Sequence, residues 1–172
     1  MRTITAQTIR TRRLDLLPLH VDHAEEMAKV LSDPALHSFT GGAPESTDAL
    51  RSRYQRMTAG SPDPSVSWLN WVLQLRDEAC LTGTVQATIG PGDRGRLAEI
   101  AWVTGTPWQS RGIATEAARA LVDWLGQQPV HTVIAHIHPE HRASAAVATA
   151  AGLTPTDESH EGEIRWHRSI TR

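Results

Sequence analysis

The sequence contains very little of several residue types that build particular sites. It has one cysteine, Cys80, one tyrosine, Tyr54, and one phenylalanine, Phe39. A single cysteine excludes an intrachain disulfide and a zinc site made of several cysteines. A single tyrosine leaves few phenolic hydroxyl groups that could donate a proton during a reaction.

Long apolar runs and a strong excess of one charge are also missing. No run approaches the roughly 20 apolar residues of a membrane-spanning helix, and the polar residues 1–13 lack the apolar segment of a signal peptide. Seventeen basic and nineteen acidic residues give a net charge of -2, which predicts no general attraction to nucleic acid or membranes. We therefore expect a reduced, soluble, cytoplasmic protein.

The chain has 172 residues, of which 40% are apolar, enough for one domain over residues 1–172 with a substantial core. No internal repeat or long linker interrupts it. Hydrophobic spacing predicts a mixed α/β fold with the order β-α-α-β-β-β-α-β-α-β. The expected strands are residues 12–19, 67–75, 82–89, 97–104, 130–137 and 163–170, and the expected helices are 22–33, 45–59, 114–126 and 141–151.

Local signals support several of these boundaries. Asp22 and Glu25 have the spacing of a capping box, and Pro34 is expected to stop the first helix. The strand–helix–strand unit over residues 97–137 is typical of a crossover between parallel strands. The helix over residues 141–151 has an apolar face made almost entirely of alanine, which suits a close approach to a neighbouring helix or to a ligand.

The most informative segment joins strand 97–104 to the helix that follows. Gln109, Arg111, Gly112 and Ala114 lie just before this helix begins. A helix N-terminus presents unpaired N–H groups, small residues let the backbone approach an anion, and an arginine adds charge, so the segment predicts a pyrophosphate cradle. The chain has no G-K-[ST] of a Walker loop and no G-x-G-x-x-G at the turn after its first strand.

Three segments carry a family resemblance. Residues 109–114 match the signature [QR]-x-x-G-x-[GA], residues 98–103 resemble the preceding strand, and residues 138–153 resemble the block after the fifth strand of the GNAT superfamily of acyl-CoA-dependent N-acyltransferases. The details are most similar to the branch that acetylates ribosomal-protein N-termini and antibiotics. The resemblance implies a GNAT-like, mixed, largely antiparallel sheet flanked by helices.

The resemblance also implies an acetyl-CoA site. The pyrophosphate would lie on the backbone N–H groups of residues 109–114, and the pantetheine arm would run along a strand edge that is freed where strands 97–104 and 130–137 splay apart. The alanine face of helix 141–151 would border the cofactor. The implied cofactor-binding residues are Trp102, Val103, Thr104, Gln109, Ser110, Arg111, Gly112, Ile113, Ala114, Thr115, His141 and Ser144.

The sequence departs from the family pattern at two positions. His141 stands where the family usually has asparagine, and Ala148 stands where it often has a tyrosine that acts as general acid. Either Ser144 or a water molecule must then protonate the leaving thiolate, or no acid is needed because a CoA thiolate is a tolerable leaving group.

Glu99 is the candidate general base. A protonated amine, with a pKa of roughly 10.4 for a lysine-like group, must lose a proton before it can attack a thioester, and a mid-strand carboxylate facing the pocket could accept it. The alternative is a surface glutamate or an ion-pair partner of an arginine. A backbone N–H near Val103 would polarise the thioester carbonyl.

Four histidines lie close together in the sequence: His131, His136, His138 and His141. A metal site is one interpretation, but the strand spacing of residues 136 and 138 provides no clear third ligand, and we expect no metal. His138 or His141 could instead lie near the thioester as a base or a substrate contact.

The acceptor side is less defined. The resemblance assigns it to the loop between the first two helices and to neighbouring strands, which makes Phe39, Trp68 and Asn70 the candidate substrate contacts, with Trp166 a further possibility. The alternative is that these aromatic residues belong to the core.

These observations predict an enzyme that transfers acetyl from acetyl-CoA to a primary amine of a small molecule or a peptide N-terminus by direct attack in a ternary complex. A non-catalytic acyl-CoA-binding sensor or partner module is the alternative, because a tyrosine acid is missing. A tRNA-acetylating toxin is a third hypothesis, which the net charge disfavours. The resemblance makes a homodimer possible.

Overall fold

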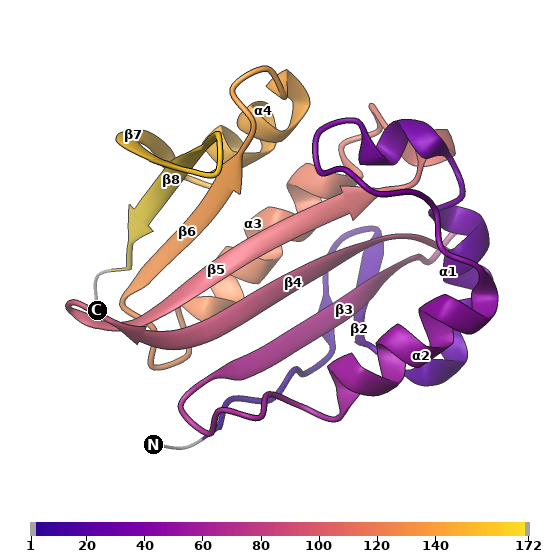
Figure 1. Cartoon of the computed structure of the whole chain (residues 1–172), viewed down its shortest axis with the longest axis horizontal. Helices are drawn as coiled ribbons and strands as arrows, with labels where there is room; N and C mark the ends of the chain where they lie inside the picture. Colours follow the sequence, from indigo (N-terminus) through magenta and orange to yellow (C-terminus); the bar gives the residue numbers. More distant parts are fainter. Residues whose placement is uncertain (1–2, 171–172) are drawn as a thin grey trace.

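A computed structural model of the protein describes residues 3–170, so the first two and the last two residues of the expected domain lie outside the described part. Eight strands form one sheet in the order β1-β2-β3-β4-β5-β6-β8-β7 (Figure 1). All neighbours are antiparallel except β5 and β6. The strands are β1 (Ile9–Arg10), β2 (Leu14–Pro18), β3 (Ser67–Leu75), β4 (Cys80–Gly92), β5 (Gly95–Thr104), β6 (Thr132–Ile137), β7 (Thr154–His160) and β8 (Glu163–Ser169).

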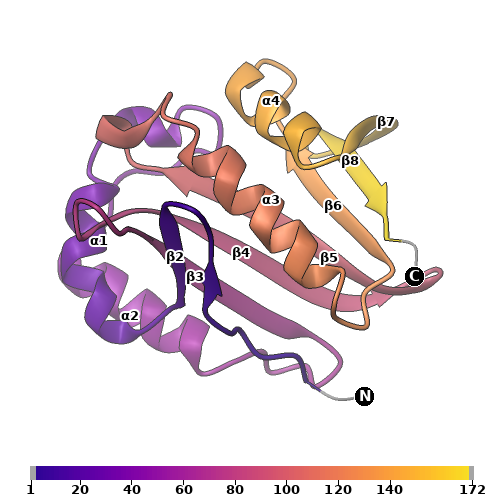
Figure 2. The same cartoon turned by 180° about the vertical axis from the view of Figure 1, so that it is seen from behind.

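Helices cover both faces of the sheet. Helices α1 and α2 lie on one face in Figure 1, and the view from behind in Figure 2 shows α3 crossing the other face with α4 beside it. Short 3-10 helices precede α1, α2 and α3. The helices are η1 (Val21–His23), α1 (Ala24–Val30), η2 (Pro34–His37), α2 (Thr47–Thr58), η3 (Thr106–Trp108), α3 (Ile113–Leu125) and α4 (Arg142–Ala150).

Side chains of β3 alternate between the two faces of the sheet, and each face packs into a separate hydrophobic core. Leu69, Trp71 and Leu73 point into the larger core beneath α3, where the Trp71 and Trp124 rings meet edge to face with centroids 5.4 Å apart. Val72 points to the opposite face and is fully buried beneath α1 and α2. Burial on both faces explains why the middle of β3 is almost continuously apolar.

The parallel pair β5–β6 is short, as the family resemblance implied. The two strands pair only where Leu97 to Glu99 meet Thr132 to Ile134. Beyond Glu99 they diverge into a fork, which Figure 1 shows between the tips of β5 and β6. Residues 100–104 of β5 therefore have a backbone edge that no strand of the described chain covers.

The predicted element order is confirmed, with two strands that the sequence analysis missed. Strand β1 has two residues and β7 is mostly exposed, so neither has a strong hydrophobic pattern. The predicted capping box of Asp22 and Glu25 is wrong. The box is made by His20 and His23 around η1, and α1 begins without a side-chain cap. None of the helices in residues 3–170 has the length and apolarity to cross a membrane.

Candidate active site

The fork between β5 and β6 opens into a cleft of about 520 Å³. Its walls come from the segment around η2, the free part of β5, the loop before α3, the end of β6 and the first turns of α4. All predicted cofactor-binding residues except Arg111 line it: Trp102, Val103, Thr104, Gln109, Ser110, Gly112, Ile113, Ala114, Thr115, His141 and Ser144. The cleft thus joins segments that are far apart in the sequence, from Ala35 to Glu163.

The N-terminus of α3 opens into this cleft without a side-chain cap. Its N-cap residue is Gly112, in the left-handed conformation with φ of +77°, and Ser110 also has a positive φ of +62°. The first intrahelical bond runs from the Glu116 amide to the Gly112 carbonyl, so the amides of residues 113–115 have no partner within the helix. An anion placed there would accept hydrogen bonds from these N–H groups and would be stabilised by the positive end of the helix dipole.

A network that the sequence analysis missed holds the cradle in place. The Arg13 guanidinium lies 2.7 Å from Glu116 and donates to the Arg111 carbonyl at 2.9 Å. Glu116 also accepts hydrogen bonds from the Thr11 hydroxyl and the Arg13 amide. Burial alone raises the pKa of Glu116, but these hydrogen bonds and the guanidinium charge outweigh it and hold the pKa below its ordinary value. No local pattern marks Arg13, because its partner is 103 residues away.

The free edge of β5 presents unused polar groups to the cleft. The Thr104 hydroxyl is buried and has no hydrogen-bond partner in the described protein. The Thr104 carbonyl accepts from the Gln109 side chain at 3.1 Å, which closes the turn into the cradle. Burying a hydroxyl without a partner costs free energy, so an orphaned group here indicates a place where a ligand completes the bonding. The uncapped helix and this edge together fit a phosphate joined to an extended, amide-containing arm.

Helix α4 forms the opposite wall. His141 caps it, because its Nδ1 accepts from the Ser144 amide at 3.2 Å, and the Ser144 hydroxyl lies 3.3 Å from His141 Nε2. Asparagine is also a good capping residue, which explains how histidine can stand in its place. Burial lowers the pKa of His141, and the neighbouring His138 lowers it further. Ala148 is fully buried, so the position where the family often has tyrosine does not face the cleft.

The alanine face of α4 is split in two. Ala148 and Ala151 are buried in the core, whereas Ala143 and Ala146 are exposed and line the cleft. The buried Val147 also lines the cleft. The expectation that small residues of this helix border the cleft therefore agrees with the geometry, but they do not lie on the buried face. Large side chains at residues 143 and 146 would occupy the cleft.

Glu99 lies at the base of the fork and is an exposed strand residue, as the surface alternative predicts. It pairs with a histidine, not an arginine: its carboxylate is 3.3 Å from His136 Nδ1. The Glu99 side chain is half exposed and is not among the residues that line the cleft, whereas His136 lines it and is 14% exposed. His136 also packs on the ring of His160, with centroids 5.6 Å apart.

The predicted acceptor contacts are divided. Phe39 lines the cleft and packs on His141 and His138, with ring centroids 4.4 and 5.1 Å away. Trp68 and Asn70 lie on β3, on the sheet face that carries Glu99, but neither lines the cleft. Trp166 packs against the core, which agrees with the alternative that it is a core residue.

Three other residues considered from the sequence lie away from the reaction site. The Arg111 side chain points to Glu78 at 3.3 Å instead of into the cleft. Tyr54 is 3% exposed, and burial raises its pKa to about 12. Burial also raises the pKa of the Cys80 thiol, aided by the charges of Glu78 and Glu26, which disfavours a thiolate nucleophile. In residues 3–170, no group of three potential ligands could hold a metal ion.

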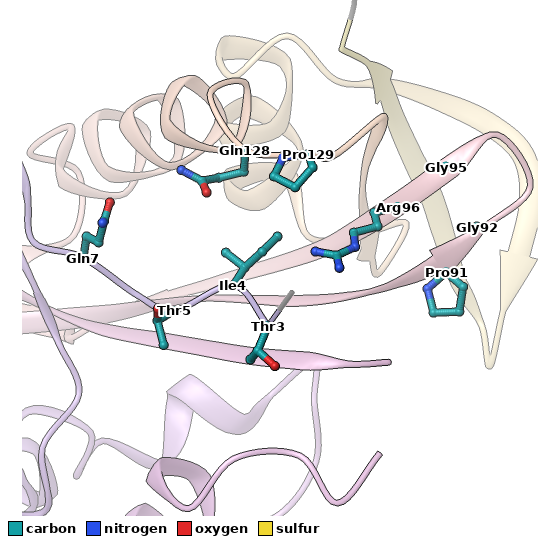
Figure 3. A pocket seen from close by; sticks show the side chains of 10 residues that line it. All are labelled: Thr3, Ile4, Thr5, Gln7, Pro91, Gly92, Gly95, Arg96, Gln128 and Pro129. Atoms are coloured by element: carbon teal, nitrogen blue, oxygen red, sulfur yellow. The ribbon is translucent and has the colours of Figure 1, made fainter. Parts of the chain in front are cut away.

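A second hollow of about 790 Å³ lies at the opposite end of β5. Figure 3 shows its wall, formed by residues 3–7, the β4–β5 hairpin and the turn after α3. Arg96 is the one ionisable side chain among its described lining residues. Gln7 serves the fold here, because its backbone carbonyl accepts from the Trp71 indole at 2.8 Å and its side chain from the Trp124 indole at 3.4 Å. The cleft at the fork is therefore the better candidate site.

Comparison with known proteins gives the family. The sequence model of the Acetyltransferase (GNAT) domain matches residues 13–154, most of the chain. The chain belongs to the GNAT acetyltransferase family. An N-acetyltransferase named YnaD of Bacillus subtilis (strain 168), itself uncharacterized, is 34% identical over 80 residues, which are 46% of this chain and 46% of that protein. The match therefore spans less than half of that relative's length.

Solved GNAT structures share the fold at low sequence identity. RimL, a ribosomal L7/L12 alpha-N-protein acetyltransferase in complex with coenzyme A, superposes with a TM-score of 0.77 at 17% identity, covering 95% of this chain and 98% of that one. Spermidine N-acetyltransferase from Vibrio cholerae, in complex with CoA and spermine, gives 0.74 at 16% identity, covering 93% and 97%. The GNAT fold is thus shared over nearly the whole chain.

Proposed function

We propose that the protein is an acetyl-CoA-dependent N-acetyltransferase that acts on a primary amine of a small molecule or a peptide N-terminus. The observation that carries the proposal is the uncapped N-terminus of α3 in the same cleft as the free edge of β5, which ends at Thr104 with its unpartnered hydroxyl. Both lie in one cleft of about 520 Å³, large enough for an extended ligand. Related structures that hold CoA support the choice of ligand.

The residues of the cleft have separate tasks in this proposal. The amides of residues 112–115 bind the pyrophosphate, and the backbone of Trp102 to Thr104 pairs with the pantetheine arm as an added strand would. Acetyl-CoA supplies an activated acetyl thioester with a stable thiolate as leaving group. A backbone N–H near Val103 orients and polarises the thioester carbonyl.

The leaving group receives its proton near α4. Ser144 is the candidate donor, because its hydroxyl lines the cleft and contacts His141 Nε2 at 3.3 Å. Tyr54 cannot serve, since it lies on α2 and is buried in the core between α1, α2 and the sheet. Direct transfer fits better than an acyl-enzyme, because burial and nearby carboxylates keep the Cys80 thiol protonated.

The acceptor reaches the acetyl group from the sheet face opposite α3. This face carries Glu99 and His136 at the fork and is bounded by Phe39 from the segment after η2. The related structures act on a protein N-terminus in one case and on spermidine in another, so the fold admits acceptors of different size. An amine acceptor agrees with the carboxylates Glu99 and Glu163 at this side.

Thermal unfolding with added ligands tests the cofactor half. We expect acetyl-CoA and CoA, but not ATP, to raise the unfolding midpoint, since a ligand at 100 times its Kd stabilises by about 2.7 kcal/mol. Gly112→Asp places a carboxylate at the cradle and should abolish this shift, because like charges repel. Gly60→Asp is the control for backbone strain, because Gly60 also has a positive φ, of +89°. Its Cβ position is open, whereas a Cβ at Gly112 would lie 3.3 Å from the Arg13 guanidinium.

Two outcomes would count against the proposal. Absence of any shift with either CoA species in the wild type would remove the cofactor assignment. A shift without acetyl transfer to any amine of a broad panel would favour the non-catalytic acyl-CoA sensor. Gly60→Asp should keep the full ligand shift, so an equal loss in both variants would point to a general effect of backbone strain.

A further inference from the structure

Family membership does not identify which residue accepts the proton of the amine. A protonated amine must lose a proton before its nitrogen can attack a thioester. Three described histidines and one described glutamate line the cleft: His136, His138, His141 and Glu163. The contacts of these four residues differ, and the differences show which side chain is free to accept a proton.

Two of the histidines already use a ring nitrogen to hold the backbone. His141 Nδ1 accepts from the Ser144 amide, and its Nε2 contacts the Ser144 hydroxyl. His138 Nδ1 accepts from the Glu140 amide at 3.1 Å, and its ring packs on Phe39. These contacts place His138 and His141 in the turn that leads into α4.

His136 has the arrangement of an oriented base. It lies just beyond the point where β5 and β6 separate, with Nδ1 3.3 Å from a Glu99 carboxylate oxygen. A carboxylate beside Nδ1 favours the tautomer with the proton on that nitrogen, which leaves Nε2 with a free lone pair. The ring is held between Glu99 on one side and His160 on the other.

We infer that His136 accepts the proton of the acceptor amine and that Glu99 is a positioning residue for its imidazole. This inference rests on the proposed function. In the step, one proton passes from the ammonium nitrogen to His136 Nε2, directly or through water, and later to solvent. The nitrogen lone pair forms the C–N bond as the C–S bond breaks, and the second proton lost from the nitrogen ends on the CoA sulfur.

The charges around His136 bear on its pH dependence. Arg165 is its register partner on β8 but is engaged by Glu158 at 3.4 Å. The groups that face His136 from the packed elements are Glu99 of β5, His160 of β7, Arg165 and Glu163 of β8, and His138 farther along its own chain segment.

Rate measurements across pH test the assignment. The probes are spermidine, an aminoglycoside and a tripeptide with an N-terminal serine, and the one with the fastest turnover is used. We expect His136→Asn to lower kcat at pH 7 by about 100-fold or more, and the rate to recover as the pH approaches the amine's own pKa. Glu99→Gln should lower kcat by about tenfold, since the imidazole loses the carboxylate that orients it.

A histidine outside the cleft provides the control for these rate measurements. His167→Asn removes an exposed histidine from the same sheet face outside the cleft, and its rate should stay within about twofold of the wild type. If Glu99→Gln loses the acid limb and His136→Asn keeps it, the base is Glu99 and the inference is overturned.

A readout that needs no turnover separates this inference from the proposed function. Nitrogen NMR of the imidazole should show His136 of the free protein with its proton on Nδ1, and Glu99→Ala should shift it toward the Nε2–H form. The unfolding shift with acetyl-CoA should be unchanged in both His136→Asn and Glu99→Gln. A proton on Nε2 in the wild type contradicts the inference, whereas a missing acetyl-CoA shift contradicts the proposed function.

Discussion

The two sides of the cleft are built in different ways. The cradle side is cross-linked to the first strands of the sheet by Arg13 and Glu116, through a contact of 2.7 Å and three further hydrogen bonds. The acceptor side is bounded by the segment around η2, where Phe39 is 39% exposed and packs on the rings of His138 and His141. In the proposed function, the fixed side would meet the part of the ligand that every acyl-CoA shares, and the loose side would meet the acceptor, which varies.

This difference has a physical reason. Backbone amides bind an anion well only when their directions are fixed in advance, because ordering them on binding would cost conformational entropy. A surface that accepts different amines has no such requirement, and binding residues often lie on loops. The contrast predicts that equivalent changes on the two sides will have unequal effects.

The largest effect is expected from breaking the anchor of the cradle. Glu116→Ala removes the acceptor of three hydrogen bonds and leaves Arg13 without its partner, so the free energy of unfolding should fall by about 2 kcal/mol. Where the segment after η2 leads into α2, Glu45→Ala breaks a pair of the same length, 2.7 Å to Arg53, whose side chains are more exposed. That loss should be under about 1 kcal/mol.

Chemical denaturation of both variants measures this comparison. The midpoints should shift with unchanged slopes, since neither change alters the surface exposed on unfolding. Equal losses for Glu116→Ala and Glu45→Ala would show that the cradle is no more firmly anchored than the acceptor side, and the contrast would fail.

An intermediate effect is expected at Phe39. Phe39→Ala removes the ring that contacts His138 and His141 across the cleft, so the KM of the acceptor amine should rise about fivefold, equivalent to about 1 kcal/mol. Stability and the acetyl-CoA shift should change little, because Phe39 is exposed. Trp68→Ala is the control, since Trp68 is equally exposed but outside the cleft. A larger effect on acetyl-CoA than on the amine would contradict the division of tasks.

The same contrast explains what the sequence could predict. The cradle is local: strand, glycine-containing loop and helix follow one another in residues 97–125, so periodicity and one motif predict them together. The cap of α2 is local in the same way, because the Ser46 side chain accepts from the Ala49 amide three residues later. Arg13 and Glu116 act together only after the chain has folded, and nothing near either residue indicates the other.

Contacts between strands limited the prediction of the acceptor side. Glu99 and His136 meet because β5 and β6 pair in one particular parallel register, which hydrophobic patterns do not specify to the residue. The family resemblance implies Trp68 and Asn70 of β3 as acceptor contacts, but β4 lies between β3 and β5, the strand at the fork. Strand β7 was missed because most of its residues are exposed and carry no apolar alternation.

The smallest expected effect is a dependence of the free energy of unfolding on pH. It arises at His141, which contacts Phe39 of the acceptor side and lines the cleft. Burial, and then the neighbouring His138, hold the pKa of His141 below its ordinary value of 6.5, so the folded protein binds fewer protons there than the unfolded chain. Protonation therefore favours unfolding, and the free energy of unfolding should fall as the pH decreases from about 7.5 through the ordinary histidine value toward 5.5.

Replacing His141, the residue that caps α4 and titrates, measures its contribution to the pH dependence of stability. His141→Asn keeps a side chain that can cap α4 but cannot titrate, so its stability should decline less than that of the wild type over the same pH range. His23, whose pKa is lowered mainly by burial, remains in both proteins and cancels in the comparison. Denaturation midpoints at several pH values measure the two slopes. Parallel slopes would mean that His141 titrates as it does in the unfolded chain, and that its role in the cleft wall is capping without any coupling to proton binding.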